Sequence, residues 1–129
     1  MKNSCAGIHV LVKKGAAYLI LRRSEKDDAD AGCWDLPGGG IGFGEQPLAA
    51  AKRETKEEAG INIAISKVPS VWTLNYQKQW TVEINILAKY LSGKIKLSTE
   101  HSDYRWVTKK ELLSVKPKAM TLKALPKHI

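Results

Sequence analysis

The stretch from Gly39 to Ile61 constrains this chain more than any other segment. It reads GGIGFGEQPLAAAKRETKEEAGI, a glycine-rich segment followed by helix-forming residues. Pro47 suits the first turn of a helix, where its missing N–H costs nothing, and Gly60 suits the left-handed position that ends a helix. The sequence therefore predicts a helix between these two residues, with a glycine-rich turn before it.

The predicted helix gathers acidic side chains on one side. At about 100° per residue, its charged arc consists of Arg53, Glu54, Glu57 and Glu58, and its apolar arc of Leu48, Ala51, Thr55 and Ala59. Like charges four residues apart, as at Glu54 and Glu58, repel each other and weaken an ordinary surface helix. A divalent cation would compensate this repulsion, because Mg²⁺ prefers carboxylate oxygens and often bridges a protein to phosphates. Arg53 is spaced to pair with Glu57.

The stretch resembles the signature of the Nudix family, G-x5-E-x7-R-E-U-x-E-E-x-G-U, in which U is a bulky apolar residue. Every fixed position matches except the first U, where this chain has Thr55 on the apolar side of the helix. The string W-x-L-P-G-G, which begins at Trp34, is also typical of that family. By this resemblance we expect residues 1–129 to form a single Nudix domain of mixed α+β class, an α/β/α sandwich around a curved mixed sheet.

The resemblance also implies a metal site. Glu54, Glu57 and Glu58 would bind Mg²⁺ or Mn²⁺, and Gly38 and Gly39 would contribute backbone carbonyls. The cation would neutralise phosphate charge and lower the pKa of a water that attacks phosphorus. The implied reaction is hydrolysis of a nucleoside diphosphate linked to another moiety, at its pyrophosphate bridge.

Other roles follow from the same resemblance. Arg53 would orient a glutamate, Glu45 would brace the loop against the start of the helix, and Gly60 would be structural. The general base would be either a glutamate of the helix or Glu100 in a later loop, with Asp103 and His101 as substitutes. The implied catalytic set is therefore Arg53, Glu54, Glu57 and Glu100.

Alternating and apolar segments predict the remaining elements. Hairpins are expected from residues 6–12 with 16–21 and from residues 70–76 with 80–90, with residues 13–15 and 77–79 as their turns. Residues 61–65 and 105–107 are expected as further strands, and residues 96–104 as a polar loop. Thr108 and Glu111 predict a capping box at the start of a helix. A last short helix is expected at residues 120–125.

Substrate contacts are expected outside the Nudix signature. Period-2 alternation sends Arg22 and Arg23 to opposite faces, so that one of them can point toward the catalytic side. The resemblance favours Arg23 as the phosphate contact. Trp72, Tyr76 and Trp80 are the aromatic residues best suited to stack on a nucleobase, and each has core or dimer packing as its alternative.

Composition limits the protein classes. The formal net charge is +8, and the chain outside Gly39–Ile61 carries 18 Lys or Arg against nine acids, which suits an anionic substrate or simply solubility. No apolar run is long enough for a membrane span and no signal-peptide region is present, which favours a cytoplasmic protein. No nucleic-acid module is recognisable. Cys5 and Cys33 are too isolated to predict a zinc site.

The substrate stays open between several nucleotides. The resemblance favours a MutT-like nucleoside triphosphate pyrophosphatase, with oxidised purine nucleotides among its candidate substrates, although Gly40 stands where such sequences often have lysine. ADP-ribose and dinucleoside polyphosphates are alternatives. A nucleotide-binding sensor without catalysis is an alternative of another class, against which the intact acidic set argues. A monomer and a homodimer are both compatible with the sequence.

Overall fold

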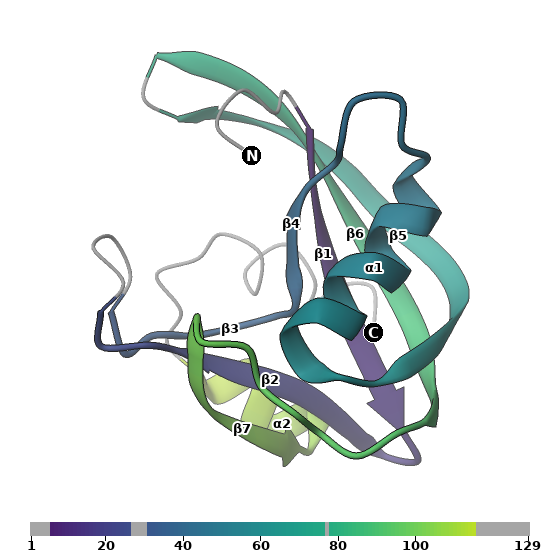
Figure 1. Cartoon of the computed structure of the whole chain (residues 1–129), viewed down its shortest axis with the longest axis vertical. Coiled ribbons are helices and arrows are strands. Elements are labelled where there is room, and N and C mark those ends of the chain that lie inside the picture. The colour runs from purple at the N-terminus through teal and green to yellow at the C-terminus, as the bar shows by residue number, and fades with distance from the viewer. Residues whose placement is uncertain (1–5, 27–30, 77, 116–129) are drawn as a thin grey trace.

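The computed structural model describes residues 6–26, 31–76 and 78–115 (Figure 1), with the side chain of residue 76 left out. These residues form one sheet and two helices. The strands are β1 (Ala6–Lys14), β2 (Ala17–Arg23), β3 (Trp34–Asp35), β4 (Gly38–Gly40), β5 (Asn62–Tyr76), β6 (Gln79–Ser92) and β7 (His101–Val107), and the helices are α1 (Pro47–Ala59) and α2 (Lys109–Ser114).

The sheet is mixed, as predicted. Its order is β3-β2-β1-β6-β5, with β4 paired to β1 and β7 paired to β2. Only the β1–β6 pair is parallel among the described strands, and the two expected hairpins, β1–β2 and β5–β6, are both present. β4 and β2 lie on the same side of β1, at its two ends, because Gly7 pairs with Gly40 and Lys13 pairs with Tyr18.

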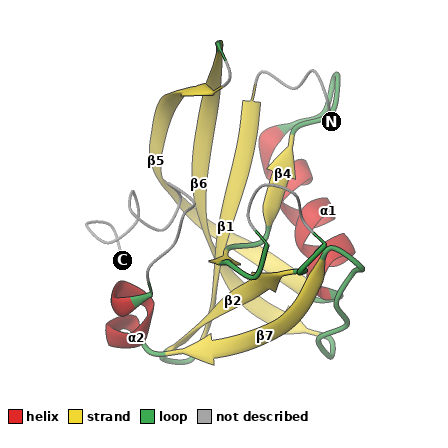
Figure 2. Ribbon diagram, turned by 90° about the vertical axis from the view of Figure 1, so that its left-hand side faces the viewer, coloured by secondary structure: helices red, strands yellow, loops and turns green. Residues whose placement is uncertain are grey.

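Each face of the sheet is covered by one helix. Ile8, Val10 and Val12 alternate along β1 and pack into a cluster with the buried alanines of α1. Leu11 points the other way and packs in a second cluster with Leu112 of α2, because successive side chains of a strand point to opposite faces. Figure 2 shows the two helices on opposite sides of the sheet, which confirms the expected α/β/α arrangement.

Both helix starts and the end of α1 agree with the sequence prediction. Pro47 begins α1, and Gly60 ends it at φ 76° with its N–H bonded to the carbonyl of Lys56. A side chain at position 60 would be strained at this φ. In α2, the Thr108 side chain accepts a bond from the N–H of Glu111, and the Glu111 carboxylate accepts one from the N–H of Thr108. The predicted capping box is therefore confirmed.

Three sheet segments differ from the prediction. Residues 38–40 form strand β4 rather than a turn, and a Cβ at Gly38 would lie 2.1 Å from the Ile8 carbonyl oxygen, so that only glycine permits this pairing. The segments predicted at 61–65 and 70–76 belong to one long strand, β5, whose register shifts between them. Residues 101–104 are part of β7 rather than of a loop, because they pair with β2.

The two arcs predicted for α1 are only partly correct. Leu48, placed on the apolar arc, is 43% exposed, whereas Glu58, placed on the charged arc, is buried. The buried face of α1 includes Ala51, Thr55 and Ala59 as expected. Glu58 differs from the prediction because β4 lies against the helix and covers its side chain.

No helix in the described part of the chain has both the length and the apolar character needed to cross a membrane. The short helix predicted at residues 120–125 lies outside the described residues.

Candidate active site

Arg53 is the centre of an ion-pair cluster on α1. Its guanidinium binds Glu45 through two hydrogen bonds, Nε to Oε2 at 2.7 Å and Nη2 to Oε1 at 2.9 Å. Nη1 also donates to Glu54 at 2.9 Å and to Glu57 at 3.2 Å, and Nη2 donates to the carbonyl of Gly40. The Glu57 pairing expected from the sequence is present, but the shorter, bidentate bond goes to Glu45. Arg53 thereby ties the loop before α1, the strand β4 and two helix carboxylates together.

Glu45 completes this frame. Besides Arg53 it accepts a hydrogen bond of 2.9 Å from the N–H of Gly42, so that it closes the loop that precedes α1. The hydrogen bond from Arg53, followed by that from Gly42, lowers the pKa of Glu45 to about 2. The carboxylate is thus ionised over the whole physiological range.

We expect Glu45→Gln to destabilise the fold in a pH-dependent way. Because the folded-state pKa is depressed from 4.5 to about 2, the stabilisation is complete above pH 4.5 and is lost as pH falls through that window. The variant should therefore be less stable than the wild type at about pH 7, and the difference should shrink toward about pH 3. Urea unfolding across this range measures it. A difference that stays constant with pH would contradict the ion-pair explanation.

Glu58 is held in a buried position between α1 and β4. Its Oε1 accepts a hydrogen bond of 2.7 Å from the N–H of Gly38, and its Oε2 lies 4.0 Å from Nε2 of His101. Burial raises the pKa of Glu58 to about 8; the Gly38 bond opposes this increase, and the neighbouring charges of Glu54 and Glu100 add to it. In the absence of a cation, Glu58 is therefore largely protonated at neutral pH.

Glu54 lies beside Glu58 and against the glycine strand. A Cβ at Gly39 would lie 2.9 Å from the Glu54 carboxyl group, so a larger residue there would push this carboxyl group from its position. Desolvation raises the pKa of Glu54, the Arg53 bond opposes this, and the charges of Glu57 and Glu100 add to the increase. Since the charge of Glu100 raises the pKa of both Glu54 and Glu58, the carboxylate of the later loop lies within electrostatic reach of the helix acids.

The chemistry of this acidic set fits a divalent cation. Glu54 and Glu58 are partly or largely buried carboxylates whose pKa values are raised first by desolvation and then by neighbouring negative charge, and carboxylate oxygens are the ligands that Mg²⁺ prefers. As they stand, no three His, Cys, Asp or Glu side chains of the described residues converge on one point that could hold an ion. Glu57 is turned toward Arg53 and Glu58 toward Gly38.

The two alternatives to Glu100 as general base, Asp103 and His101, have different surroundings. His101 is buried beside Glu58. Asp103 is exposed, and its carboxylate caps the N–H of Tyr104. The structure therefore brings Glu100 and His101 to the helix glutamates and leaves Asp103 in a local contact of its own.

The two arginines of β2 have different surroundings. Arg22 binds Glu25 at 3.0 Å and the carbonyl of Gly32 at 3.1 Å, in the loop after the strand. Arg23 donates to Oδ2 of Asp35 at 3.0 Å, and its charge reaches Glu58, whose pKa it lowers slightly. Asp35 is buried and was not among the residues predicted from the sequence, although it stands inside the W-x-L-P-G-G string.

The predicted aromatic residues do not form one group. Trp72 stacks on His9, with ring centroids 6.1 Å apart and an interplanar angle of 23°, on the face of the sheet opposite α1. Its indole Nε1 is buried and has no hydrogen-bond partner among the described residues. Trp80 is 68% exposed near the β5–β6 turn. The side chain of Tyr76 lies outside the described residues.

His9 and Glu83 are further polar residues that sequence reasoning missed. His9 Nε2 lies 2.8 Å from Glu83 Oε1, and both side chains are largely buried beside Trp72. The available signal was a polar residue within an apolar strand, in GIHVLV and TVEINI. Such a residue needs a partner when buried, and here the partner comes from a distant strand.

Comparisons with known proteins relate the sequence and the fold of this chain to one family. The model of the NUDIX domain family matches residues 1–126. An RNA pyrophosphohydrolase of Roseobacter denitrificans is 27% identical, with 84% of this chain and 78% of that protein covered. The nucleoside triphosphatase NudI of Escherichia coli is 26% identical over 89% of each chain. A crystal structure of the MutT protein from Methanosarcina mazei Go1 is 26% identical and superimposes with a TM-score of 0.82, covering 96% of this chain and 91% of that one.

Proposed function

The chain belongs to the Nudix hydrolase family, and from this premise we propose that it hydrolyses the pyrophosphate bridge of a nucleoside diphosphate linked to another moiety, with Mg²⁺ or Mn²⁺. One observation carries the proposal. The charges of Glu54 and Glu100 both act on the buried Glu58, which lies against the glycine strand beside the Arg53–Glu45 frame. Family members generally use divalent metal ions. In the described part of this chain, the carboxylates around the glycine strand outnumber the one arginine, Arg53, that pairs with them.

Five residues are proposed to hold the cation. They are the carboxylates of Glu54, Glu57 and Glu58 and the backbone carbonyls of Gly38 and Gly39. When bound, the cation would supply Lewis acidity and neutralise charge on the phosphates. Glycine at position 39 leaves the Glu54 carboxyl group where it is, because a Cβ there would lie 2.9 Å from that group and the Glu54 side chain would have to shift.

The remaining residues act by orientation and proton transfer. Arg53 orients Glu54 and Glu57 through hydrogen bonds from Nη1, and Glu45 holds Arg53. The proton on Glu58 is assigned to Oε2, because Oε1 accepts the Gly38 N–H. That proton must leave before Glu58 can act as an ionised ligand. The general base is proposed as either Glu100 or a helix glutamate, since each can accept a proton once it is ionised.

The substrate is proposed to be a nucleoside triphosphate, with oxidised purine nucleotides included. Two relatives support this choice, the protein named nucleoside triphosphatase NudI and the protein named MutT. Arg23 is proposed to contact phosphate, since its charge already reaches Glu58. Trp72 is proposed to contact the base, because a buried indole N–H without a partner is a donor still available to a ligand.

A panel of nucleotides tests the proposal. It should contain the common and oxidised nucleoside triphosphates, ADP-ribose, a dinucleoside polyphosphate and a 5′-triphosphorylated RNA, each with Mg²⁺, with Mn²⁺ and with EDTA. We expect cation-dependent release of pyrophosphate and a nucleoside monophosphate from a triphosphate. Preference for the RNA would favour the activity named for the Roseobacter relative. No hydrolysis of any compound would reject the enzyme in favour of a nucleotide sensor.

A further inference from the structure

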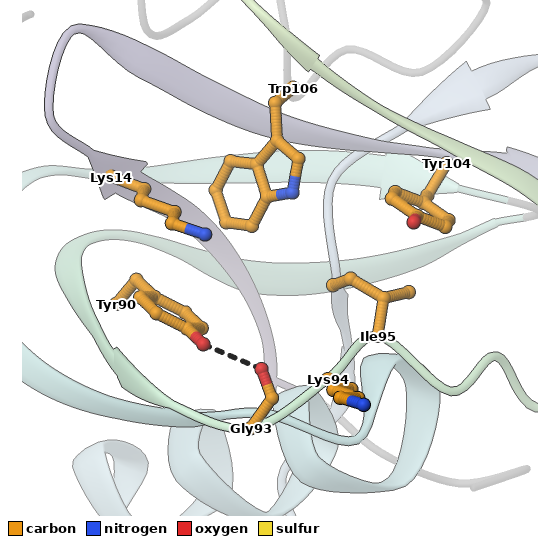
Figure 3. A pocket seen from close by; sticks show the side chains of 7 residues that line it. All are labelled: Lys14, Tyr90, Gly93, Lys94, Ile95, Tyr104 and Trp106. Carbon is orange, nitrogen blue, oxygen red and sulfur yellow. Dashed lines mark hydrogen bonds between the residues drawn. The ribbon is translucent and has the colours of Figure 1, made fainter.

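A pocket lies on the α1 side of the sheet. It is lined by residues of β1, β6, β7 and the loop after β6, and its volume is about 410 Å³. Figure 3 shows Trp106 and Tyr104 of β7 on one side and Tyr90 with the Gly93–Ile95 segment on the other. None of the residues proposed for the catalytic or metal site lines it.

The aromatic walls of this pocket are already in place. Tyr90 and Trp106 meet edge to face, with ring centroids 5.9 Å apart at 82°. The hydroxyl of Tyr90 donates to the carbonyl of Gly93 at 2.6 Å. Gly93 adopts φ 104° and packs so tightly on the end of α1 that a Cβ there would lie 3.0 Å from the Gly60 carbonyl oxygen. A ligand would therefore bind against aromatic rings that are already held in position, which reduces the entropy cost of binding.

The pocket is strongly basic. The ammonium group of Lys14 lies 4.5 Å from the Tyr90 ring centroid and 5.5 Å from that of Trp106, and Figure 3 shows it pointing between the two rings. Neither Lys14 nor Lys94 pairs with a carboxylate in the described part of the chain. A neighbouring pocket of about 300 Å³ shares Lys14 and Tyr90 and adds Lys13 and Lys89. No acidic residue lines either pocket.

The pocket is separate from the glutamates yet lies on the same side of the sheet. His101, which contacts Glu58, begins β7, and Trp106 stands five residues further along that strand. At about 3.3 Å per residue the two positions are roughly 16 Å apart. A base stacked on Trp106 would therefore lie well away from the glutamates at which the phosphates are proposed to be cleaved.

We propose that this pocket is a second nucleotide site. The base stacks on the exposed ring of Tyr104 and on Trp106, and the phosphate binds the ammonium groups of Lys14 and Lys94. Proteins bind single-stranded nucleic acid by stacking its bases on aromatic rings and by placing cations beside its phosphates. A single nucleotide presents the same two groups. Tyr104 is 41% exposed, so its ring is available to a ligand.

Titration of the protein with AMP in EDTA tests the proposal. Binding is detected through the indole N–H signals of the tryptophans in a nitrogen-15 NMR spectrum. EDTA removes the divalent cations on which binding at the glutamates would depend. We expect AMP to shift the Trp106 signal, which the Trp106→Phe variant identifies. Adenosine and ribose 5-phosphate, which each carry half of the ligand, should bind more weakly than AMP.

Variants distinguish a built site from general attraction to a basic protein. Tyr104→Ala and Lys14→Gln should each weaken AMP binding at least about fivefold, as expected for a lost base stack or phosphate contact. Tyr104→Phe should retain binding, and the exposed Lys52→Gln on α1 is the charge-matched control. Equal affinity in Lys14→Gln and Lys52→Gln, or AMP shifting the signal of Trp72 but not that of Trp106, would overturn the proposal.

Discussion

Glu57→Gln is expected to lower the cation-dependent rate by at least about two orders of magnitude while the fold stays intact. The Glu57 side chain is 58% exposed, and its ion pair is a single 3.2 Å contact with Arg53. Glutamine keeps the shape of the side chain and removes only its charge. The loss should therefore fall on cation binding and hydrolysis and leave the unfolding free energy nearly unchanged, within about 0.5 kcal/mol as for most surface substitutions.

The measurement is the rate of product release with Mg²⁺ and with Mn²⁺, together with urea unfolding in EDTA. Lys52→Gln provides the control, because it changes an exposed charged residue on the same helix to the same amide. A Glu57→Gln protein that unfolds like the wild type and hydrolyses nucleotide at the wild-type rate would contradict the proposed metal ligand set.

Glu58→Gln is expected to inactivate the enzyme and yet to stabilise the cation-free protein at alkaline pH. Burial raises the folded-state pKa of Glu58 from 4.5 to about 8, so the folded protein holds a proton that the unfolded chain has lost. The unfolding free energy of the wild type in EDTA should therefore fall as pH rises from about 4.5 through 8. Glutamine does not ionise, and its side-chain oxygen can still accept the Gly38 N–H. The variant should lack this pH-dependent loss.

Urea unfolding in EDTA at about pH 5, 7 and 9 measures this difference. We expect similar stabilities at the acidic end and a more stable variant at the alkaline end. Hydrolysis with Mg²⁺ should be lost at every pH. A variant whose stability follows the same pH dependence as the wild type would show that Glu58 is not the buried titrating group.

The local elements of the fold could be predicted because their signals lie within a few residues. Pro47 and Gly60 define α1 through fixed and positive φ angles, and Thr108 with Glu111 defines the start of α2 through bonds inside one turn. The extent of β7 could not be predicted in this way. Residues 101–104 carry polar side chains, and their strand conformation depends on hydrogen bonds with β2, some 80 residues earlier in the chain.

The sequence by itself determined the family and the acidic residues that share a helix, because both depend on residue types at fixed spacing along one segment. Only the tertiary structure decided how these acids differ. Glu57 stays in solvent, whereas β4 shields Glu58 and the loop before β7 adds the charge of Glu100. The pKa of a carboxylate depends on what lies around it in space, and those neighbours come from distant parts of the chain. The aromatic pocket arises for the same reason, since Lys14, Tyr90 and Trp106 meet only when three strands assemble.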